Sequence, residues 1–359
     1  MNATLERARA FLFGKGSYAF LLALPLVLVF AHRGVAVILL AMAIASATAT
    51  GPWARLARLF SPPIDARAPG KAGAYSLAAF ALWVLASSLW SPISGAWNLA
   101  LIVGSAALAG FFAFEGVLAR DEAALRTARR AFLWACLLAL ALFCFEAASD
   151  GYLRFNAPLI DHSRGRAKDI VALGRGLTAL LPSLFVVGGF YALRAQQAAE
   201  KRRAIFLAAI AIIALAALFV SSGLTIAANT TGILAGLAAA GLAYVVGRRV
   251  VRLLVIAYVG ALALAPALAL LPAVDLARDF AGEAPDSWMQ RLFVWRHAAQ
   301  EALACLPFGC GADYARALSE KGVMIDVPGS ALPLALTPTH PHNAFLQIWL
   351  ELGIPGVAL

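Results

Sequence analysis

The chain has 359 residues, of which 62% are hydrophobic and only 13% are charged. Soluble globular proteins average about 25% charged residues. Several apolar runs here reach the roughly 20 residues that an α-helix needs to cross a bilayer. This composition excludes an ordinary soluble domain and predicts an all-α polytopic membrane protein.

Ten apolar segments are predicted to span the membrane. The first is expected to be a retained span, because no small-residue cleavage site of the kind found in signal peptides follows its apolar run. The predicted spans are residues 17–31, 35–51, 73–90, 97–114, 131–148, 176–193, 204–220, 228–246, 253–271 and 343–359.

The net charge of +10 is explained by membrane topology. The N-terminal segment and the loops 52–72, 115–130, 194–203 and 247–252 together hold 18 Lys and Arg residues and six acidic residues. The opposite side of the predicted spans holds 11 basic and 12 acidic residues. Because cytoplasmic loops carry an excess of Lys and Arg, the N-terminus is predicted to be cytoplasmic. We therefore expect membrane lipids as partners and no nucleic acid.

The first long external segment is predicted between Ser149 and Arg175. It contains a basic cluster with Arg164 and Arg166, which could attract phosphate or could simply be solvated. Arg175 lies between two glycines at the expected start of a span, where a helix N-terminus suits phosphate and glycine lets a ligand approach the backbone. The alternative is an interfacial arginine that reaches toward lipid headgroups.

The second external segment is predicted over residues 272–342, and loops of that length are usually functional or internally folded. Within it, apolar residues at spacings of three and four predict a helix from Asp286 to Ala302. Arg291 lies on the aromatic stripe of this helix, between Trp288 and Trp295. A cation on an apolar face requires an anionic or aromatic partner. That partner is either a ligand or one of the two indole rings.

The predicted helix is expected to end at the breaker cluster Pro307-Phe308-Gly309-Cys310-Gly311. Cys305 and Cys310 lie in this external segment, where their spacing permits but does not require a disulfide. The other two cysteines, Cys136 and Cys144, are expected to be small core residues of the fifth span.

The end of the chain carries the most specific pattern. His342-Asn343 precedes an apolar helix and is followed after nine residues by Gly353-x-x-Gly356, and His340-Pro341 comes just before it. This pattern resembles the signature of the bacterial O-antigen ligase and polymerase superfamily, membrane glycosyltransferases that use lipid-linked glycans.

Two other segments are similar to the same superfamily. Arg291-x-x-x-Trp295, followed by the Pro-Phe-Gly-x-Gly turn, resembles the helix and turn that precede the signature. Gly174-Arg175-Gly176 before an apolar run resembles the superfamily's Arg-Gly segment.

The resemblance implies a GT-C-like architecture with about 12 spans, so the chain with its ten predicted spans looks truncated at the C-terminus. The expected division is a transmembrane region over 1–271, a periplasmic loop over 272–342, and the start of a C-terminal transmembrane region over 343–359.

The resemblance also implies a reaction. An O-antigen ligase of the bacterial inner membrane, with its active site facing the periplasm, would transfer glycan from undecaprenyl pyrophosphate to lipid A–core. The expected roles are general base for His342 and donor pyrophosphate binding for Arg175 and Arg291. His340 and Asn343 are expected to support the site, as are Arg164 and Arg166.

No cofactor or metal is expected. The chain has no Asp-x-Asp, the metal-binding motif of nucleotide-sugar transferases, and no Walker A or Rossmann glycine pattern. A pre-activated lipid pyrophosphate donor fits both facts, because arginines can stabilise its leaving group. The reaction is accordingly expected to be inverting and independent of metal.

Several alternatives remain open at this point. His342 could be a helix-capping or structural group. The chain could be an O-antigen polymerase or a protein O-oligosaccharyltransferase of the same superfamily. A membrane transporter also suits ten spans, but its helices should carry charges or breaks at mid-membrane. The predicted spans here are nearly free of charge.

Overall fold

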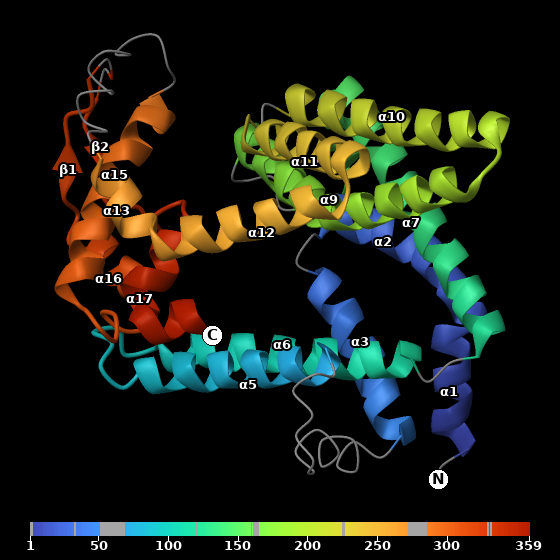
Figure 1. Ribbon diagram of the computed structural model, residues 1–359, viewed down its shortest axis with the longest axis horizontal. Coiled ribbons are helices and arrows are strands. Elements are labelled where there is room, and N and C mark those ends of the chain that lie inside the picture. The colour runs from blue at the N-terminus through green and yellow to red at the C-terminus, as the bar shows by residue number, and fades with distance from the viewer. Residues whose placement is uncertain are drawn as a thin grey trace. The chain divides into compact units, whose positions relative to one another are not determined.

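The computed structural model describes residues 3–31, 34–50, 69–118, 121–158, 160, 165–224, 227–271, 286–328, 330 and 332–359. Within these residues the fold is helical apart from one short β-hairpin (Figure 1). The prediction of an all-α polytopic membrane protein is confirmed.

The chain forms two compact units. Unit 1 comprises Met1–Leu56 and Ala109–Gly247, and unit 2 comprises Ala57–Leu108 and Arg248–Leu359. Each unit is therefore built from two separated stretches of sequence. The boundaries predicted at residues 271 and 342 do not coincide with this grouping and stay a prediction.

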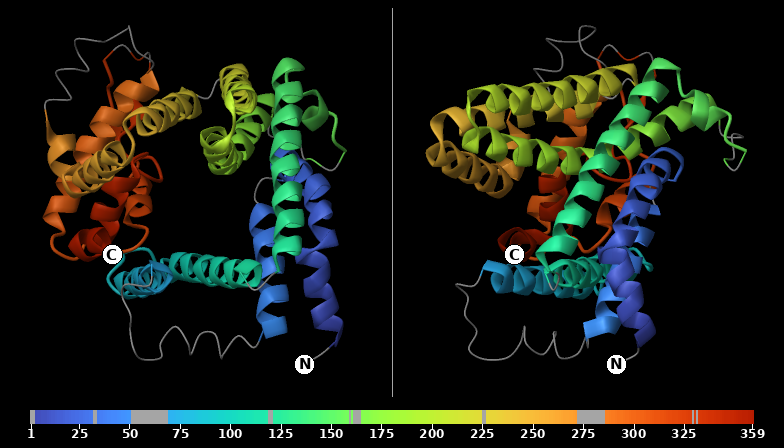
Figure 2. Two further views of the ribbon diagram at one scale, coloured as in Figure 1. Left: turned by 45° about the vertical axis from the view of Figure 1, so that its right-hand side comes forward. Right: turned by 90° about the vertical axis from the view of Figure 1, so that its right-hand side faces the viewer.

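Unit 1 is a helical bundle. Its elements are α1 (Ala3–Phe13), the 3-10 helix η1 (Lys15–Tyr18), α2 (Ala19–Phe30), α3 (Val35–Thr50), α7 (Glu122–Ala148), α8 (Tyr152–Phe155), α9 (Arg166–Gln197), α10 (Glu200–Gly223) and α11 (Ala227–Val246). Helices α2 and α7 run side by side (Figure 2). Its core is formed by fully buried side chains such as Leu28, Phe143 and Leu177, contributed by α2, α7 and α9.

Unit 2 combines helices with the hairpin. Its elements are α5 (Pro69–Ser87), the first part of α6 (Trp97–Leu118), α12 (Arg248–Ala263), α13 (Ala265–Leu270), α15 (Asp286–Ala304), α16 (Tyr314–Glu320), β1 (Met324–Ile325), β2 (Leu334–Ala335) and α17 (Ala344–Ala358). The two strands are antiparallel, with Met324 opposite Ala335. Helix α15 begins where the sequence predicted a helix.

Fewer helices than predicted are long enough to span a membrane. Four helices in the described part of the chain qualify by length and composition: Glu122–Ala148, Lys168–Gln197, Glu200–Gly223 and Ala228–Val246. A fifth arises if the bent pair Glu6–Leu12 and Lys15–Phe30 is one span. Four other predicted spans correspond to shorter apolar helices: Val35–Ala45, Tyr75–Ser87, Trp97–Ala113 and Ala344–Ala358.

The predicted span 253–271 is divided into two helices. Helix α12 ends at Ala263, and α13 starts with Pro266 in its first turn. Proline lacks the N–H that would continue the preceding helix but is well suited to a helix start. Apolar composition alone did not reveal this break.

The end of α7 and the start of α9 are joined by a buried polar network. The Glu146 carboxylate accepts hydrogen bonds from the backbone N–H groups of Leu153 and Arg154, at 2.9 and 3.2 Å. The Arg154 guanidinium bonds to Asp169 at 3.1 Å and to the Val29 carbonyl at 2.6 Å. Because all three charged side chains are buried, this network fixes the course of the chain between α7 and α9.

Candidate active site

The segment before α17 places His342 in an unusual backbone conformation. His342 has φ +53°, in the left-handed region that non-glycine residues rarely adopt. The preceding Pro341 is fully buried, and its carbonyl accepts a 2.9 Å hydrogen bond from Nε1 of Trp295 on α15. The surrounding structure therefore holds the histidine in place.

Two imidazole rings face each other at this point. The ring centroids of His340 and His342 are 4.1 Å apart with an interplanar angle of 72°. The backbone N–H of His342 donates to Nδ1 of His340 at 3.3 Å. Nδ1 of His340 is thereby assigned as an acceptor, and both residues keep part of their surface exposed to solvent.

Asn343 is the N-cap of α17. Its side-chain oxygen accepts hydrogen bonds from the N–H groups of Phe345 and Leu346, at 3.1 and 3.3 Å. Asparagine is among the preferred residues for this position. The prediction that the His-Asn pair stands just before a helix is confirmed, and the cap fixes where His342 lies relative to α17.

Arg291 on α15 is electrostatically coupled to His342. Partial burial lowers the pKa of His342, and the electrostatic influence of His340 and Arg291 lowers it further. Because an ordinary imidazole titrates near pH 6.5, His342 is neutral at pH 7. Arg291 is half-buried and forms no ion pair within the described residues, so its guanidinium can take an anionic ligand.

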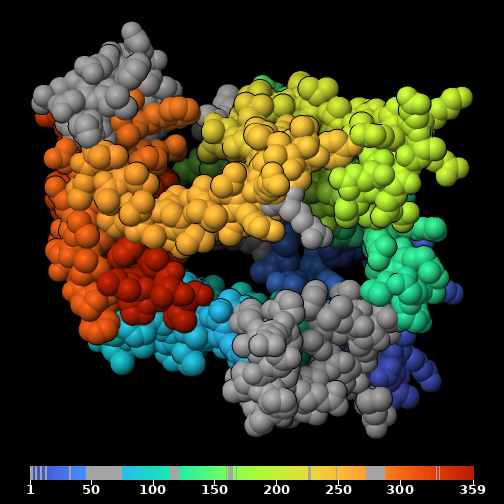
Figure 3. All heavy atoms as spheres, in the orientation of Figure 1, coloured from blue at the N-terminus to red at the C-terminus, as the bar shows by residue number. Residues whose placement is uncertain are grey.

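Small and aromatic side chains hold α15, α13 and α17 together. Ala299 and Leu346 are fully buried against Ala265 and Ala269 of α13. The indole of Trp349 donates to the Leu262 carbonyl of α12 at 2.7 Å. In Figure 3 the atoms of α12, α13 and α17 form one continuous surface. The segment that contains His340 and His342 thus leads directly into a helix, α17, that is packed against α12, α13 and α15.

Gly353, the first glycine of the Gly-x-x-Gly pattern, has a structural role. It interrupts α17 with φ +61° and ψ −155°, a conformation essentially limited to glycine. The turn that ends α15 docks on this break: Cys310 N–H donates to the Leu350 carbonyl at 2.7 Å, and Ile354 N–H donates to the Pro307 carbonyl at 2.8 Å. A Cβ atom at Gly353 would overlap backbone atoms of Pro307 and Gly309. The two glycine-rich segments therefore form one packing unit.

Three further contacts complete this packing unit. Trp83 and Trp90, near the end of α5, donate hydrogen bonds to the carbonyls of Leu352 and Gly309, at 2.9 and 3.0 Å. Cys305 and Cys310 form a disulfide, which the sequence had left open. The breaker cluster does end α15 as predicted, and its glycines allow the close backbone approach.

Glu351 belongs to a buried polar network. Its side chain is 4% exposed and accepts a 3.2 Å hydrogen bond from Nε2 of Gln347. The backbone amides of Asp313 and Ala315, at the start of α16, also bond to it. Glu351 stabilises the arrangement of α16 and α17.

Arg175 lies in unit 1, whereas His342 and Arg291 lie in unit 2. The helix that carries Arg175 begins at Arg166, so the expectation that Arg175 starts a helix is wrong. The residue lies nine positions into α9, roughly 13 Å along it. Its side chain is exposed, and its role in donor binding stays a prediction.

The glycine after Arg175 is used for helix packing. A Cβ atom at Gly176 would overlap the Leu28 carbonyl oxygen and approach the Phe143 ring within 2.9 Å. Two residues on, Thr178 exchanges hydrogen bonds with Asn229 of α11 at 3.0 and 3.1 Å. The glycine thus brings α9 close to α2.

The remaining predicted site residues are Arg166 and Arg164. Arg166 forms an ion pair with Asp150 at 2.8 Å and stacks over the Phe155 ring at 4.7 Å. Both charged groups of the pair are largely exposed. Arg164 lies outside the described residues.

Sequence reasoning did not find the bond between Trp295 and Pro341. The two residues are 46 positions apart, and an indole on a helical stripe usually signals core packing only. In the sequence, only the place of Trp295 in the Arg-x-x-x-Trp motif of the family resemblance pointed to a role beyond core packing.

Comparison with known proteins finds a family match for part of the chain. Residues 216–359 match the family model described as O-antigen ligase. The matched region includes Arg291, His340, His342 and the docked glycine segments.

Two curated relatives agree with this assignment. They are proteins named as polysaccharide ligases from Rickettsia typhi and Rickettsia prowazekii, each 42% identical over 71 residues. The match covers 19% of this chain and 17% of each relative, so the chain spans less than a fifth of the relatives' length. No solved structure is significantly similar to this chain.

Proposed function

We propose that the protein transfers O-antigen glycan from undecaprenyl pyrophosphate to a sugar hydroxyl of lipid A–core. The reaction would take place at the periplasmic face of the bacterial inner membrane, as a step of lipopolysaccharide biosynthesis. The observation that carries this proposal is the anchored backbone before His342, whose pKa is lowered in part by Arg291, a residue without an ion pair among the described residues, within the region that matches the O-antigen ligase family model.

His342 acts as the general base. Its neutral imidazole takes the proton of the acceptor hydroxyl as the oxygen attacks the anomeric carbon of the donor. The bond between that carbon and the pyrophosphate oxygen breaks, and polyprenyl pyrophosphate leaves with the bonding electrons. A single displacement of this kind inverts the anomeric configuration.

Arginines stabilise the departing pyrophosphate. Arg291 is near enough to influence His342 and has no protein anion to neutralise it in the described residues. A guanidinium can bind two phosphate oxygens at once, which an ammonium group cannot do equally well. Arg175 is the proposed second group on the donor.

The proposed reaction needs no metal ion. In the described part of the chain, no three His, Cys, Asp or Glu side chains gather in a way that could hold one. We expect transfer to survive EDTA. Chelator-sensitive transfer that Mg²⁺ restores would contradict this part of the proposal.

Charge and redox chemistry support the proposed orientation in the membrane. The basic loops favour a cytoplasmic N-terminus, and the Cys305–Cys310 disulfide suits an oxidising compartment such as the periplasm. Single cysteines introduced into the segment 312–328 should react with an impermeant reagent in intact spheroplasts. Labelling only after the inner membrane is permeabilised would reverse the orientation.

The lipopolysaccharide ladder of a deletion strain tests the reaction itself. Loss of all O-antigen from core, with accumulation of lipid-linked polymer, is the expected result for a ligase. Core capped by a single repeat would instead assign polymerase activity. An unchanged ladder would exclude both activities.

A further inference from the structure

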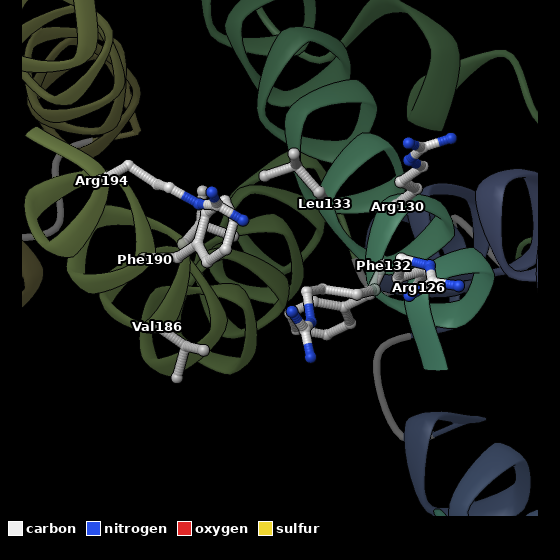
Figure 4. Close-up of a pocket in the computed structure, with 9 residues that line it drawn as sticks. Arg126, Arg130, Phe132, Leu133, Val186, Phe190 and Arg194 are labelled. Carbon is white, nitrogen blue, oxygen red and sulfur yellow. The ribbon is translucent and has the colours of Figure 1, made fainter. Parts of the chain in front are cut away.

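A basic pocket lies between α7 and α9 in unit 1, separate from the residues discussed so far. Its volume is about 320 Å³. Four arginines line it: Arg126, Arg129 and Arg130 from the start of α7, and Arg194 from the end of α9. In Figure 4, Arg194 and Phe190 of α9 face Leu133 of α7 across the space between the two helices, and the guanidinium of Arg130 points away from α9.

Charged and apolar residues are segregated along the pocket. On α7, residues 126, 129, 130 and 133 recur at spacings of three and four and so share one helix face. On α9, Val186, Phe190 and Arg194 follow each other at steps of four. At the ends of the helices the pocket is basic, and one turn further in it is apolar, with Leu133 opposite Val186 and Phe190.

The arginines are poorly neutralised by the protein. Arg126 has Glu122 at 3.6 Å, but both side chains are largely exposed, and such pairs contribute little. Arg129, Arg130 and Arg194 have no carboxylate partner within the described residues. The Arg194 guanidinium lies 5.3 Å from the centre of the Phe190 ring, which orients it without cancelling its charge.

We propose that this pocket binds the phosphate headgroup of an anionic phospholipid of the cytoplasmic leaflet. The charge distribution of the sequence places the start of α7 and the end of α9 on the cytoplasmic side. Basic pockets between transmembrane helices on that side bind anionic lipid headgroups. The site is thus remote from the proposed periplasmic chemistry and does not depend on it.

The apolar inner wall favours a lipid over a free anion. A free phosphate or nucleotide would contact the guanidinium groups but would make no contact with the apolar wall formed by Leu133, Val186 and Phe190. A phospholipid places its phosphate among the arginines and the first part of an acyl chain against that wall. Arginines that only set the membrane topology could lie anywhere on the cytoplasmic side. Here four arginines from two helices line a single pocket.

The proposal can be tested with purified full-length protein in neutral detergent. The probe is phosphatidylglycerol with a fluorescent acyl chain, whose binding is followed by anisotropy. The variant carries Arg126→Gln, Arg129→Gln, Arg130→Gln and Arg194→Gln. A control variant removes four charges outside the pocket on the same predicted side, through Lys201→Gln, Arg202→Gln, Arg249→Gln and Arg252→Gln.

We expect the pocket variant to bind the probe at least tenfold more weakly, and the control to remain within twofold of wild type. Phosphatidylcholine and inorganic phosphate should compete poorly. Single Arg→Gln changes, which disturb folding least, should each weaken binding by about fivefold, in line with roughly 1 kcal/mol for one basic residue near an anionic lipid.

Three outcomes would overturn the proposal. One is wild-type binding by the pocket variant. Another is an equal loss of probe binding in the control variant, which would show that binding depends only on the net charge of the protein. The third is competition by undecaprenyl pyrophosphate at concentrations far below those of phosphatidylglycerol, because it would assign the pocket to a polyprenyl ligand.

Discussion

The indole Nε1 of Trp295 donates a 2.9 Å hydrogen bond to the carbonyl oxygen of Pro341, next to the candidate base His342. This bond connects α15, which carries Arg291, with the segment that carries the two histidines. One helix therefore supplies both the cation beside His342 and the anchor for its backbone. Trp295 is accordingly a positioning residue in the proposed reaction.

Replacing Trp295 by Phe should lower kcat more than it changes KM. The ring is largely retained, but the bond to Pro341 is lost, which costs about 1 kcal/mol, or about fivefold in rate. The measurement is in vitro transfer from purified lipid-linked donor to core acceptor. Trp288→Phe on the same helix is the control, since Trp288 is exposed and makes no such bond within the described residues. A kcat unchanged by Trp295→Phe would remove the positioning role.

Arg175→Lys and Arg291→Lys should each impair transfer although the charge is kept. Lysine cannot reproduce two-point binding of phosphate, and the loss of charged hydrogen bonds is worth about 1.5–3 kcal/mol, tenfold or more in rate. Arg296→Lys, also on α15, is the matched control and should be near wild type. Full activity with lysine at both positions, at wild-type protein level, would rule out the arginine clamp.

The pH profile of transfer should reveal the coupling between His342 and Arg291. The pKa of His342 is lowered, so the neutral base persists on acidification and activity should fall only below pH 6.5, as the imidazole becomes protonated. In Arg291→Gln a positive charge is removed, the pKa rises, and the acid limb should move to higher pH. Arg296→Gln should leave the limb in place. An acid limb that does not move in Arg291→Gln would show that these two groups are not coupled.

Gly353→Ala should destabilise the protein strongly. Its backbone conformation costs an alanine of the order of 1–3 kcal/mol, and the overlap with Pro307 and Gly309 adds to that. Gly260→Ala is the control, because a Cβ there meets open space on α12. Alanine should leave the stability unchanged or raise it at Gly260 by up to about 1 kcal/mol. Thermal unfolding in detergent distinguishes the two, and equal melting temperatures would contradict the packing role of Gly353.

Local features of the site could be predicted from the sequence. The helix containing Arg291, its end at the Pro-Phe-Gly-x-Gly turn and the start of α17 after Asn343 all follow from short-range rules of periodicity, breaking and capping. These are properties of a few consecutive residues.

Other features depend on contacts between residues far apart in the sequence, and they could not be predicted from the sequence. The docking of Pro307 and Cys310 on the break at Gly353 requires two segments to meet, and the bond from Trp295 to Pro341 joins a helix to a remote loop. Hydropathy registers apolar length but not the helix breaks at Leu264 and Gly353, which interrupt two of the ten predicted spans.

The most direct test of the account is the activity of His342 variants. His342→Ala removes the base, and His342→Asn removes it while keeping a residue that tolerates the left-handed backbone at this position. Both proteins should insert and elute like wild type, and both should lose about 10²–10⁴-fold in transfer from lipid-linked donor to core acceptor, as expected for general-base catalysis. His340→Ala, which keeps the base, should be milder. Wild-type rates in both His342 variants would make this histidine a structural group and contradict the proposed mechanism.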